Sequence, residues 1–183
     1  MKKFALLPLL SLLLAACSSG EITPPHSLGN PDAKVLIEEF SDPECPACAN
    51  ISPQVEQFVK DNPSLARMEY YHFPLSQHKF AFIVAEGAEC AGDQGKFWEY
   101  LDTIFETQAS LSEDHIFKVA DSLELDRTTF DACVDDHKYK SKILSHMAEG
   151  SRRRIPGTPT LFVNGEMVRW SDPETFKSYL ESL

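Results

Sequence analysis

The chain has 183 residues, of which 43% are hydrophobic and 25% are charged, values that are usual for a globular protein with one domain. Its 28 acidic residues outnumber its 17 basic residues and give a net charge of -11. This balance excludes nucleic acid as an expected partner, because a surface that binds phosphates must be basic.

The first 16 residues have the order of a secretory signal peptide. Two lysines precede an apolar stretch at 4–14, and two alanines follow it. This stretch is too short to be a comfortable membrane-spanning helix. Residues 14–17 also resemble the lipobox of bacterial lipoproteins, so we expect residues 1–16 to be removed and Cys17 to carry a lipid. The alternative is an ordinary signal peptide with a cysteine near its cleavage site.

Residues 17–30 contain Ser, Gly and Pro and few apolar residues, which predicts a flexible tether, and residues 31–183 are expected to form the domain. Outside the cytosol, disulfides form and persist. Without Cys17 the chain has four cysteines, which allow three pairings. Proximity in the sequence favours Cys45 with Cys48, which leaves Cys90 with Cys133.

Cys45 and Cys48 are separated by two residues. They follow a predicted strand at 35–40 and precede a helical pattern that extends to about residue 60, with a kink expected at Pro53. A C-x-x-C pair at such a place is typical of thioredoxin-like redox sites. The same spacing begins many zinc sites, so this pattern alone leaves a metal site open.

The rest of the chain predicts a strand at 67–73, helices from about 77 to 154, a hairpin and a last helix. Asn164-Gly165 between two apolar runs indicates the hairpin, and Asp172-Pro173 has the composition of a helix start. The expected fold class is therefore α/β, with a helical subdomain inserted between two strand-bearing halves.

Three separated segments resemble the DsbA-like thiol-disulfide oxidoreductases of the thioredoxin superfamily. They are the active-site segment at 39–48, the cis-proline loop and hairpin at 157–165, and the helical region at 88–98. The resemblance extends from about Val35 to the C-terminus. It implies a thioredoxin fold with a helical insertion at about 77–154, a redox-active disulfide, no other cofactor and no metal.

The resemblance also assigns roles to the two cysteines. Cys45 is expected to be the exposed attacking thiol, because the start of a helix stabilises a thiolate, and Cys48 is expected to be the buried resolving thiol. Strongly oxidising DsbA proteins have Pro-His between these cysteines, whereas this chain has Pro46 and Ala47. This departure leaves the oxidising strength and the direction of electron flow open.

Glu39 lies six residues before Cys45, at the position of a buried acid that resembles a proton relay in this superfamily. Because Glu38 and Glu39 face opposite sides of a strand, we expect Glu38 to face solvent and Glu39 to be buried. A buried Glu39 with a raised pKa can exchange a proton with Cys48. The alternative is that Glu39 is an ordinary acid at the solvent-facing edge of the strand.

The resemblance further implies a cis peptide bond between Thr158 and Pro159, where the main chain of Thr158 would pair with an extended substrate. A simple proline turn is the alternative. Cys90 and Cys133 are expected to form a structural disulfide between two helices of the insertion. They could instead remain free thiols or act as a second redox pair.

The sequence thus predicts a membrane-anchored lipoprotein that faces the periplasm or the cell exterior. Its expected activity is that of an oxidase that donates the Cys45-Cys48 disulfide to unfolded or partly folded exported proteins, and a membrane redox partner would reoxidise it. One alternative is a reductase or isomerase on the same scaffold. Another is a metal-handling lipoprotein that uses both thiolates as ligands, although no further Cys or His lies at zinc-finger spacing.

Overall fold

The computed structural model describes residues 22–183, so the predicted signal peptide and the predicted lipid site at Cys17 lie outside it. One mixed sheet has the strand order β1-β3-β2-β4-β5. The strands β2 and β3 are parallel, and the other neighbouring strands are antiparallel. The strands are β1 (His26–Gly29), β2 (Val35–Ser41), β3 (Ala66–His72), β4 (Thr160–Val163) and β5 (Glu166–Val168).

Helices cover both faces of this sheet. The helices α1 (Pro46–Asp61) and α7 (Pro173–Glu181) pack on one face, where the rings of Phe58 and Phe176 are 5.5 Å apart. The helix α6 (Lys140–Arg152) packs against the other face, where Gly150 leaves room for Phe40 and Phe73. Because side chains alternate along a strand, β2 turns Ile37, Glu39 and Ser41 towards α1. The sequence from β2 to α1 therefore brings the C-x-x-C segment to the carboxyl end of a central strand.

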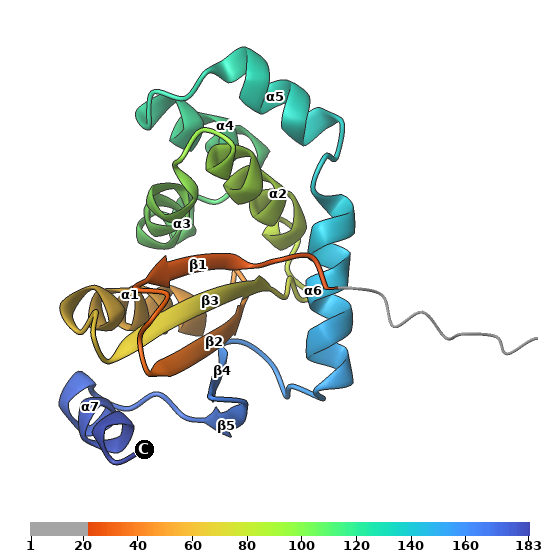
Figure 1. Ribbon diagram of the computed structural model, residues 1–183. Coiled ribbons are helices and arrows are strands. Elements are labelled where there is room, and N and C mark those ends of the chain that lie inside the picture. The colour runs from red at the N-terminus through yellow and green to blue at the C-terminus, as the bar shows by residue number, and fades with distance from the viewer. Residues whose placement is uncertain (1–21) are drawn as a thin grey trace, which may run out of the picture.

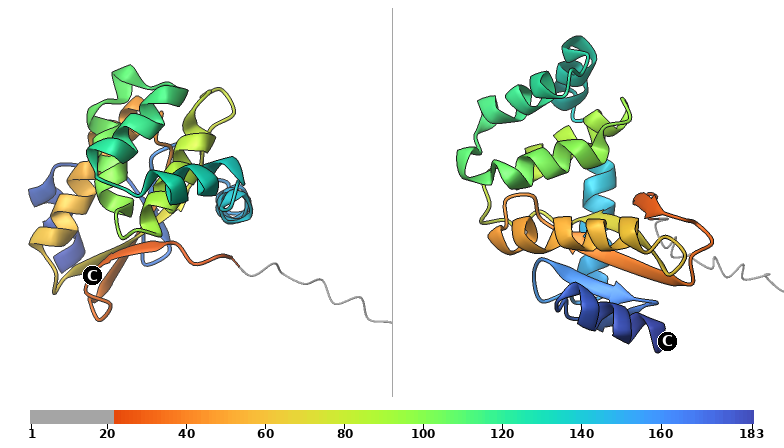
Figure 2. Two further views of the ribbon diagram at one scale, coloured as in Figure 1. Left: turned by 90° about the horizontal axis from the view of Figure 1, so that it is seen from above. Right: turned by 90° about the vertical axis from the view of Figure 1, so that its left-hand side faces the viewer.

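The remaining helices form a layer beyond α1, which the right-hand view in Figure 2 separates clearly from the sheet. This layer consists of α2 (Ala81–Gly92), α3 (Phe97–Glu106), the short 3-10 helix η1 (Gln108–Ser110), α4 (Glu113–Ser122) and α5 (Arg127–Asp135). Its core is formed by fully buried side chains, among them Tyr100, Ile104, Ile116 and Phe130. Gly87 is required for this packing, because a Cβ atom there would lie 2.6 Å from the Tyr100 hydroxyl. The predicted α/β fold with an inserted helical region is confirmed (Figure 1).

The expectation of an unstructured tether up to residue 30 is wrong for its last part. Residues His26–Gly29 form β1, an edge strand that pairs with β3. The His26 ring stacks on Phe97 with centroids 3.6 Å apart, and its Nε2 lies 2.8 Å from the carboxylate of Glu89. Contacts with the helical insertion therefore add this segment to the domain.

The expectation that Glu38 faces solvent is also wrong. Glu38 is only 5% exposed, and its carboxylate accepts a hydrogen bond of 2.6 Å from Arg153, which follows α6. The Arg153 guanidinium also lies over the rings of Phe40 and Phe162. The two faces of β2 do separate Glu38 from Glu39, but α6 covers the face that carries Glu38.

Two further features concern the helices. The helix α1 runs through Pro53 as one helix from Pro46 to Asp61. Within residues 22–183, no helix is both long enough and apolar enough to cross a membrane.

Candidate active site

The two cysteines of the C-x-x-C segment lie at the start of α1. Cys45 is the N-cap residue, and Pro46 occupies the first helical position, where its missing N–H costs no hydrogen bond. Cys48 follows one turn later and is fully buried, whereas Cys45 is 8% exposed. Cys45 is therefore more accessible than Cys48, as expected, but it is not an exposed residue. The N-terminus of a helix favours a negative charge, and this is where the Cys45 sulfur lies.

The loop before β4 lies directly opposite Cys45. The peptide bond between Thr158 and Pro159 is cis, and the Cys45 thiol donates a hydrogen bond of 3.4 Å to the Thr158 carbonyl oxygen. The two segments are 113 residues apart in sequence, and the fold brings them together. Of the predicted substrate-binding residues, Thr158 thus contacts the thiol through its main chain.

The segment between β2 and α1 is held by Asp42. Its buried carboxylate accepts hydrogen bonds from the main chain of Glu44 and Leu75, both of 2.7 Å, and from His78 at 2.8 Å. The main-chain N–H of Asp42 donates to the Cys48 sulfur at 3.4 Å. Asp42 therefore fixes the turn that presents both cysteines, a role that the sequence analysis missed.

A side chain from the helical insertion supports the same turn. The Gln108 amide donates hydrogen bonds to the carbonyl oxygens of Pro43 at 3.0 Å and Cys45 at 3.1 Å. No local pattern in the sequence indicates such a role, because Gln108 is 63 residues from Cys45. The insertion is thus in direct contact with the active-site turn.

Glu39 lies beneath α1 and is fully buried. Burial raises the pKa of Glu39 to about 7, although hydrogen bonds from Ser52 and Ser41 act in the opposite direction. The Ser52 hydroxyl donates to Oε1 of Glu39, while Oε2 has no hydrogen-bond partner among the described residues. Burial also raises the pKa of the Cys48 thiol, and hydrogen bonds from Ser41 and the Asp42 main chain oppose this shift. The structure therefore places a protonatable carboxyl and a protonated thiol in the same buried region.

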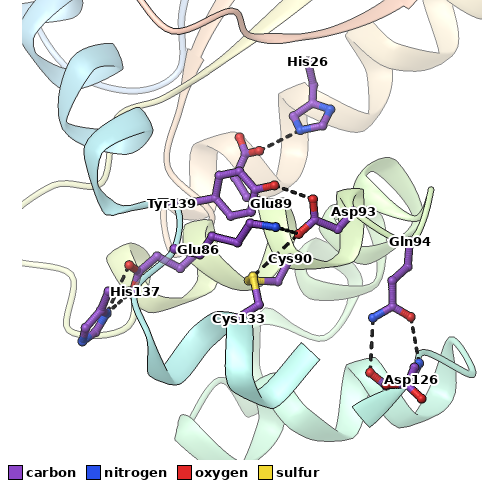
Figure 3. The surroundings of a disulfide bond; sticks show 11 residues. His26, Glu86, Glu89, Cys90, Asp93, Gln94, Asp126, Cys133, His137 and Tyr139 are labelled. Carbon is purple, nitrogen blue, oxygen red and sulfur yellow. Dashed lines mark hydrogen bonds and ion pairs between the residues drawn. A yellow bond between two sulfur atoms is a disulfide. The ribbon is translucent and has the colours of Figure 1, made fainter. Parts of the chain in front are cut away.

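A disulfide joins Cys90 on α2 to Cys133 on α5, with 5.9 Å between the Cα atoms (Figure 3). Polar side chains surround it. Asp93 accepts hydrogen bonds from Lys138 and Tyr139, and the buried Glu86 carboxylate lies 2.9 Å from Nδ1 of His137 (Figure 3). The disulfide lies in the helical layer and is distinct from the Cys45 and Cys48 pair.

Next to this disulfide, Glu89 forms the centre of a buried ionic network. Its carboxylate contacts His26 at 2.8 Å, His72 at 2.9 Å and Lys142 at 2.8 Å. His72 is fully buried, and the sequence analysis gave no indication of this network. Among residues 22–183, no group of three or more His, Cys, Asp or Glu side chains has a geometry that could hold a metal ion.

Known proteins are similar to this chain in sequence and in fold. The profile of a family described as thioredoxin matches residues 21–182. The crystal structure of Pseudomonas aeruginosa DsbA2 is 25% identical, with a TM-score of 0.69 over 89% of this chain and 96% of that chain. A thioredoxin-like oxidoreductase from Silicibacter pomeroyi is 22% identical, with a TM-score of 0.74 over 86% of this chain and 91% of that chain.

Curated relatives match over a part of their length. The Na(+)/H(+) antiporter NhaA 1 of Salinispora arenicola is 35% identical over 141 residues, which are 76% of this chain and 22% of that protein. This chain thus spans less than a quarter of that relative. The chain belongs to the thioredoxin family, and its fold is the one found in DsbA-type thiol-disulfide oxidoreductases.

Proposed function

We propose that this protein is an extracytoplasmic thiol-disulfide oxidoreductase that donates the Cys45-Cys48 disulfide to exported proteins. The observation that carries the proposal is the pair of thiols at the start of α1, with the cis-proline loop against Cys45 and the carboxyl of Glu39 beneath Cys48. Each group has a separate part in thiol-disulfide exchange.

The reaction has two steps. A substrate thiolate attacks the Cys45 sulfur, forms a mixed disulfide and expels the Cys48 sulfur with the electron pair of the broken S–S bond. A second substrate thiolate then attacks the substrate sulfur of the mixed disulfide, and Cys45 leaves as a thiolate. The substrate loses two electrons as its dithiol becomes a disulfide, and the enzyme gains two electrons.

Glu39 supplies the proton that the first step requires. The Cys48 sulfur is expelled into a buried environment that disfavours its thiolate, so it must be protonated. A carboxyl with a pKa of about 7 is a suitable general acid at neutral pH. During reoxidation the same carboxylate accepts the proton from Cys48.

A groove beside the cis-proline loop favours an unfolded peptide chain as the substrate. It has a volume of about 430 Å³, and the residues that line it include Ile51, Pro159, Met167 and Trp170. Met167 is 49% exposed although it is apolar. Such a surface fits the apolar side chains that an unfolded chain exposes, and the nearby main chain of Thr158 fits contact with extended backbone.

The remaining parts of the proposal rest on the sequence and on the chemistry of the reaction. The signal at residues 1–16 and the lipid at Cys17 would hold the domain at a membrane outside the cytosol. A membrane redox partner would accept the two electrons that the enzyme gains. Because Ala47 stands where strongly oxidising relatives have His, we expect a reduction potential between that of thioredoxin, about -270 mV, and that of DsbA, about -120 mV.

The test is the oxidation of a reduced, unfolded protein by the oxidised enzyme, followed through the loss of substrate thiols. We expect Cys45→Ser to abolish the reaction. Reduced Cys48→Ser, mixed with a protein that contains a disulfide, should accumulate a mixed disulfide at Cys45, because the Cys45 thiolate expels one substrate sulfur and no resolving thiol follows; mass spectrometry detects this product. Oxidation at an undiminished rate by Cys45→Ser would refute the assignment of the attacking thiol. A reduction potential below that of thioredoxin would instead indicate a reductase or isomerase.

A further inference from the structure

The loop that joins β3 to α2 brings a histidine side chain to the active-site turn. We propose that this residue, His78, is a positioning residue that raises the reduction potential of the Cys45-Cys48 pair by holding the carboxylate of Asp42. The inference rests on the proposed thiol-disulfide exchange but not on its direction, because a reduction potential is the same quantity for an oxidase and for a reductase.

Asp42 connects His78 with both cysteines. The main-chain N–H of Asp42 donates a hydrogen bond of 3.4 Å to the Cys48 sulfur, and its carbonyl oxygen accepts one of 3.1 Å from the N–H of Cys45. The side chain of Asp42 is fully buried, and its carboxylate accepts a hydrogen bond of 2.8 Å from Nδ1 of His78. One residue thus contacts the loop through its side chain and the C-x-x-C segment through its main chain.

A tight turn at residues 75–78 gives His78 its position. The N–H of His78 donates to the carbonyl oxygen of Leu75 at 3.0 Å and closes this turn. The N–H of Leu75 and the ring of His78 therefore meet the same oxygen atom of Asp42, Oδ2, at 2.7 and 2.8 Å. Because a carboxylate only accepts hydrogen bonds, Nδ1 of His78 carries the proton of this contact. The His78 side chain is 21% exposed, so water and salt screen the contact only weakly.

Among residues 22–183, His78 is the one side chain that donates to this carboxylate. The other two donors are the main-chain N–H groups of Glu44 and Leu75, which a change of side chain does not remove. The second acid of the turn, Glu44, accepts a hydrogen bond from the main chain of Phe80 at the end of the same loop. A substitution of His78 therefore removes a contact of Asp42 and leaves these main-chain contacts in place.

The contact should matter more in the reduced state than in the oxidised state. Cys45 and Cys48 are free thiols in this structure, so the hydrogen bond from Asp42 to Cys48 belongs to the reduced protein. A disulfide carries no charge, whereas the reduced pair provides a thiolate during exchange. A nearby N–H donor stabilises a negative charge on sulfur, and a nearby carboxylate destabilises it. His78 favours the thiolate in both ways, because it fixes the main chain of Asp42 and offsets part of the charge of its carboxylate.

Loss of His78 should therefore destabilise the reduced pair relative to the disulfide. The disulfide then becomes harder to reduce, and the reduction potential falls. A side chain that only stabilises the fold acts equally on both redox states and leaves the potential unchanged. The potential thus distinguishes a positioning role from a structural one.

The test is equilibration of the protein with glutathione buffers at neutral pH, followed by acid quenching and alkylation. The mass of the peptide that contains Cys45 and Cys48 gives the oxidised fraction. We expect His78→Ala to shift the equilibrium constant about fivefold towards the disulfide, which corresponds to a potential lower by about 20 mV. His78→Phe keeps a ring without a donor and should give the same shift. His78→Asn keeps an N–H donor near the position of Nδ1 and should restore most of the potential.

A matched control is available in the helical insertion. Nδ1 of His137 lies 2.9 Å from the buried carboxylate of Glu86, beside the Cys90-Cys133 disulfide (Figure 3). His137→Ala removes a contact of the same kind, so it should lower the unfolding free energy. Because this contact does not involve the active-site turn, the potential of the redox pair should stay that of the wild type.

Asp42→Asn tests whether His78 acts through Asp42. In this background the carboxylate is absent, so adding His78→Ala should change the equilibrium constant less than about twofold. An equal shift with and without the carboxylate would overturn the proposal, since His78 would then act independently of Asp42.

Three other results would also overturn it. The first is a shift below about twofold in both His78→Ala and His78→Phe, with a normal redox pair in the wild type; this would reject the role of His78 and leave the proposed function intact. The second is a His78→Asn potential equal to that of His78→Ala, because the N–H donor would then not be the cause. The third is a wild-type protein in which Cys45 and Cys48 form no disulfide in any buffer, which would overturn the proposed function together with the role of His78.

Discussion

The buried carboxyl of Glu39 should make the stability of the protein depend on pH in a way that one substitution removes. The pKa of Glu39 is about 7, compared with an ordinary value of 4.5, and its side chain is fully buried. A shift of one pKa unit corresponds to about 1.4 kcal/mol, so the ionised carboxylate destabilises the folded protein by about 3 kcal/mol at pH 8.

The sign follows from proton binding in the two states. Between pH 4.5 and about 7 the unfolded chain has an ionised Glu39 while the folded chain keeps it protonated. The folded state therefore binds more protons, and stability falls as the pH rises through this window. Below pH 4.5 both states are protonated, and the penalty is absent.

Glu39→Gln should remove this penalty. We expect the difference in unfolding free energy, variant minus wild type, to increase by about 3 kcal/mol between pH 4 and pH 8. Urea denaturation of both proteins at several pH values measures it, with both in the same redox state as verified by alkylation. Effects of other titrating groups cancel in the difference. Glu166→Gln, at an exposed site on β5, controls for the removal of one negative charge.

A difference that stays constant between pH 4 and pH 8 would refute the reasoning, because the carboxyl would then have the same proton affinity in both states. A decrease with rising pH would show that the folded protein stabilises the carboxylate. In either case Glu39 would no longer be a suitable acid for Cys48 at neutral pH.

Three further predictions concern the rest of the molecule. Replacing Cys90 and Cys133 by Ala should lower the unfolding free energy by about 4 kcal/mol in the chain-entropy description, measured by urea denaturation, while the reactions of Cys45 persist. Burial lowers the pKa of His146 to about 4, so the unfolded chain binds a proton at this histidine more readily than the folded protein does. The unfolding free energy should therefore fall as the pH decreases from about 6.5 to 4. His146→Gln should weaken that fall, and an acid profile of stability that the substitution leaves unchanged would contradict this prediction. Gln108→Ala leaves two carbonyl oxygens of the active-site turn without their donor. It should lower the unfolding free energy by about 1 kcal/mol and slow thiol-disulfide exchange. An unaltered exchange rate would show that the insertion does not support the turn.

Local chemistry made much of the fold predictable. Several signals determine the structure of residues close to them in the sequence. They are Pro46 at the first position of α1, the Asn164-Gly165 turn between β4 and β5, and the Asp172 cap of α7. The alternation of side chains along β2 likewise indicated that Glu38 and Glu39 lie on different faces.

Contacts between distant segments were not predictable from the sequence. Glu38 is buried because Arg153, 115 residues later, pairs with it, and β1 is ordered because His26 meets Glu89, 63 residues later. The roles of Asp42 and Gln108 in the active-site turn also depend on hydrogen-bond partners that are distant in the sequence. Such pairs become visible only when the whole chain is folded.

The serines are an intermediate case. Ser41 lies two residues after Glu39 on a strand, and Ser52 lies four residues after Cys48 on a helix. The two spacings place each serine on the same face as one functional group, although the sequence analysis assigned no role to either serine. What the sequence did not show is the contact between the serines, which depends on α1 packing on β2.

The most direct test of the proposed function is the redox state of Cys45 and Cys48 in cells that produce the protein. Rapid acid quenching followed by alkylation of free thiols, with Cys45→Ser as the reference for a single remaining thiol, gives the oxidised fraction by mass. An oxidase that a membrane partner keeps charged should be found mostly as the Cys45-Cys48 disulfide. A protein found mostly with both thiols free would contradict the oxidase and assign the site to reduction or isomerisation.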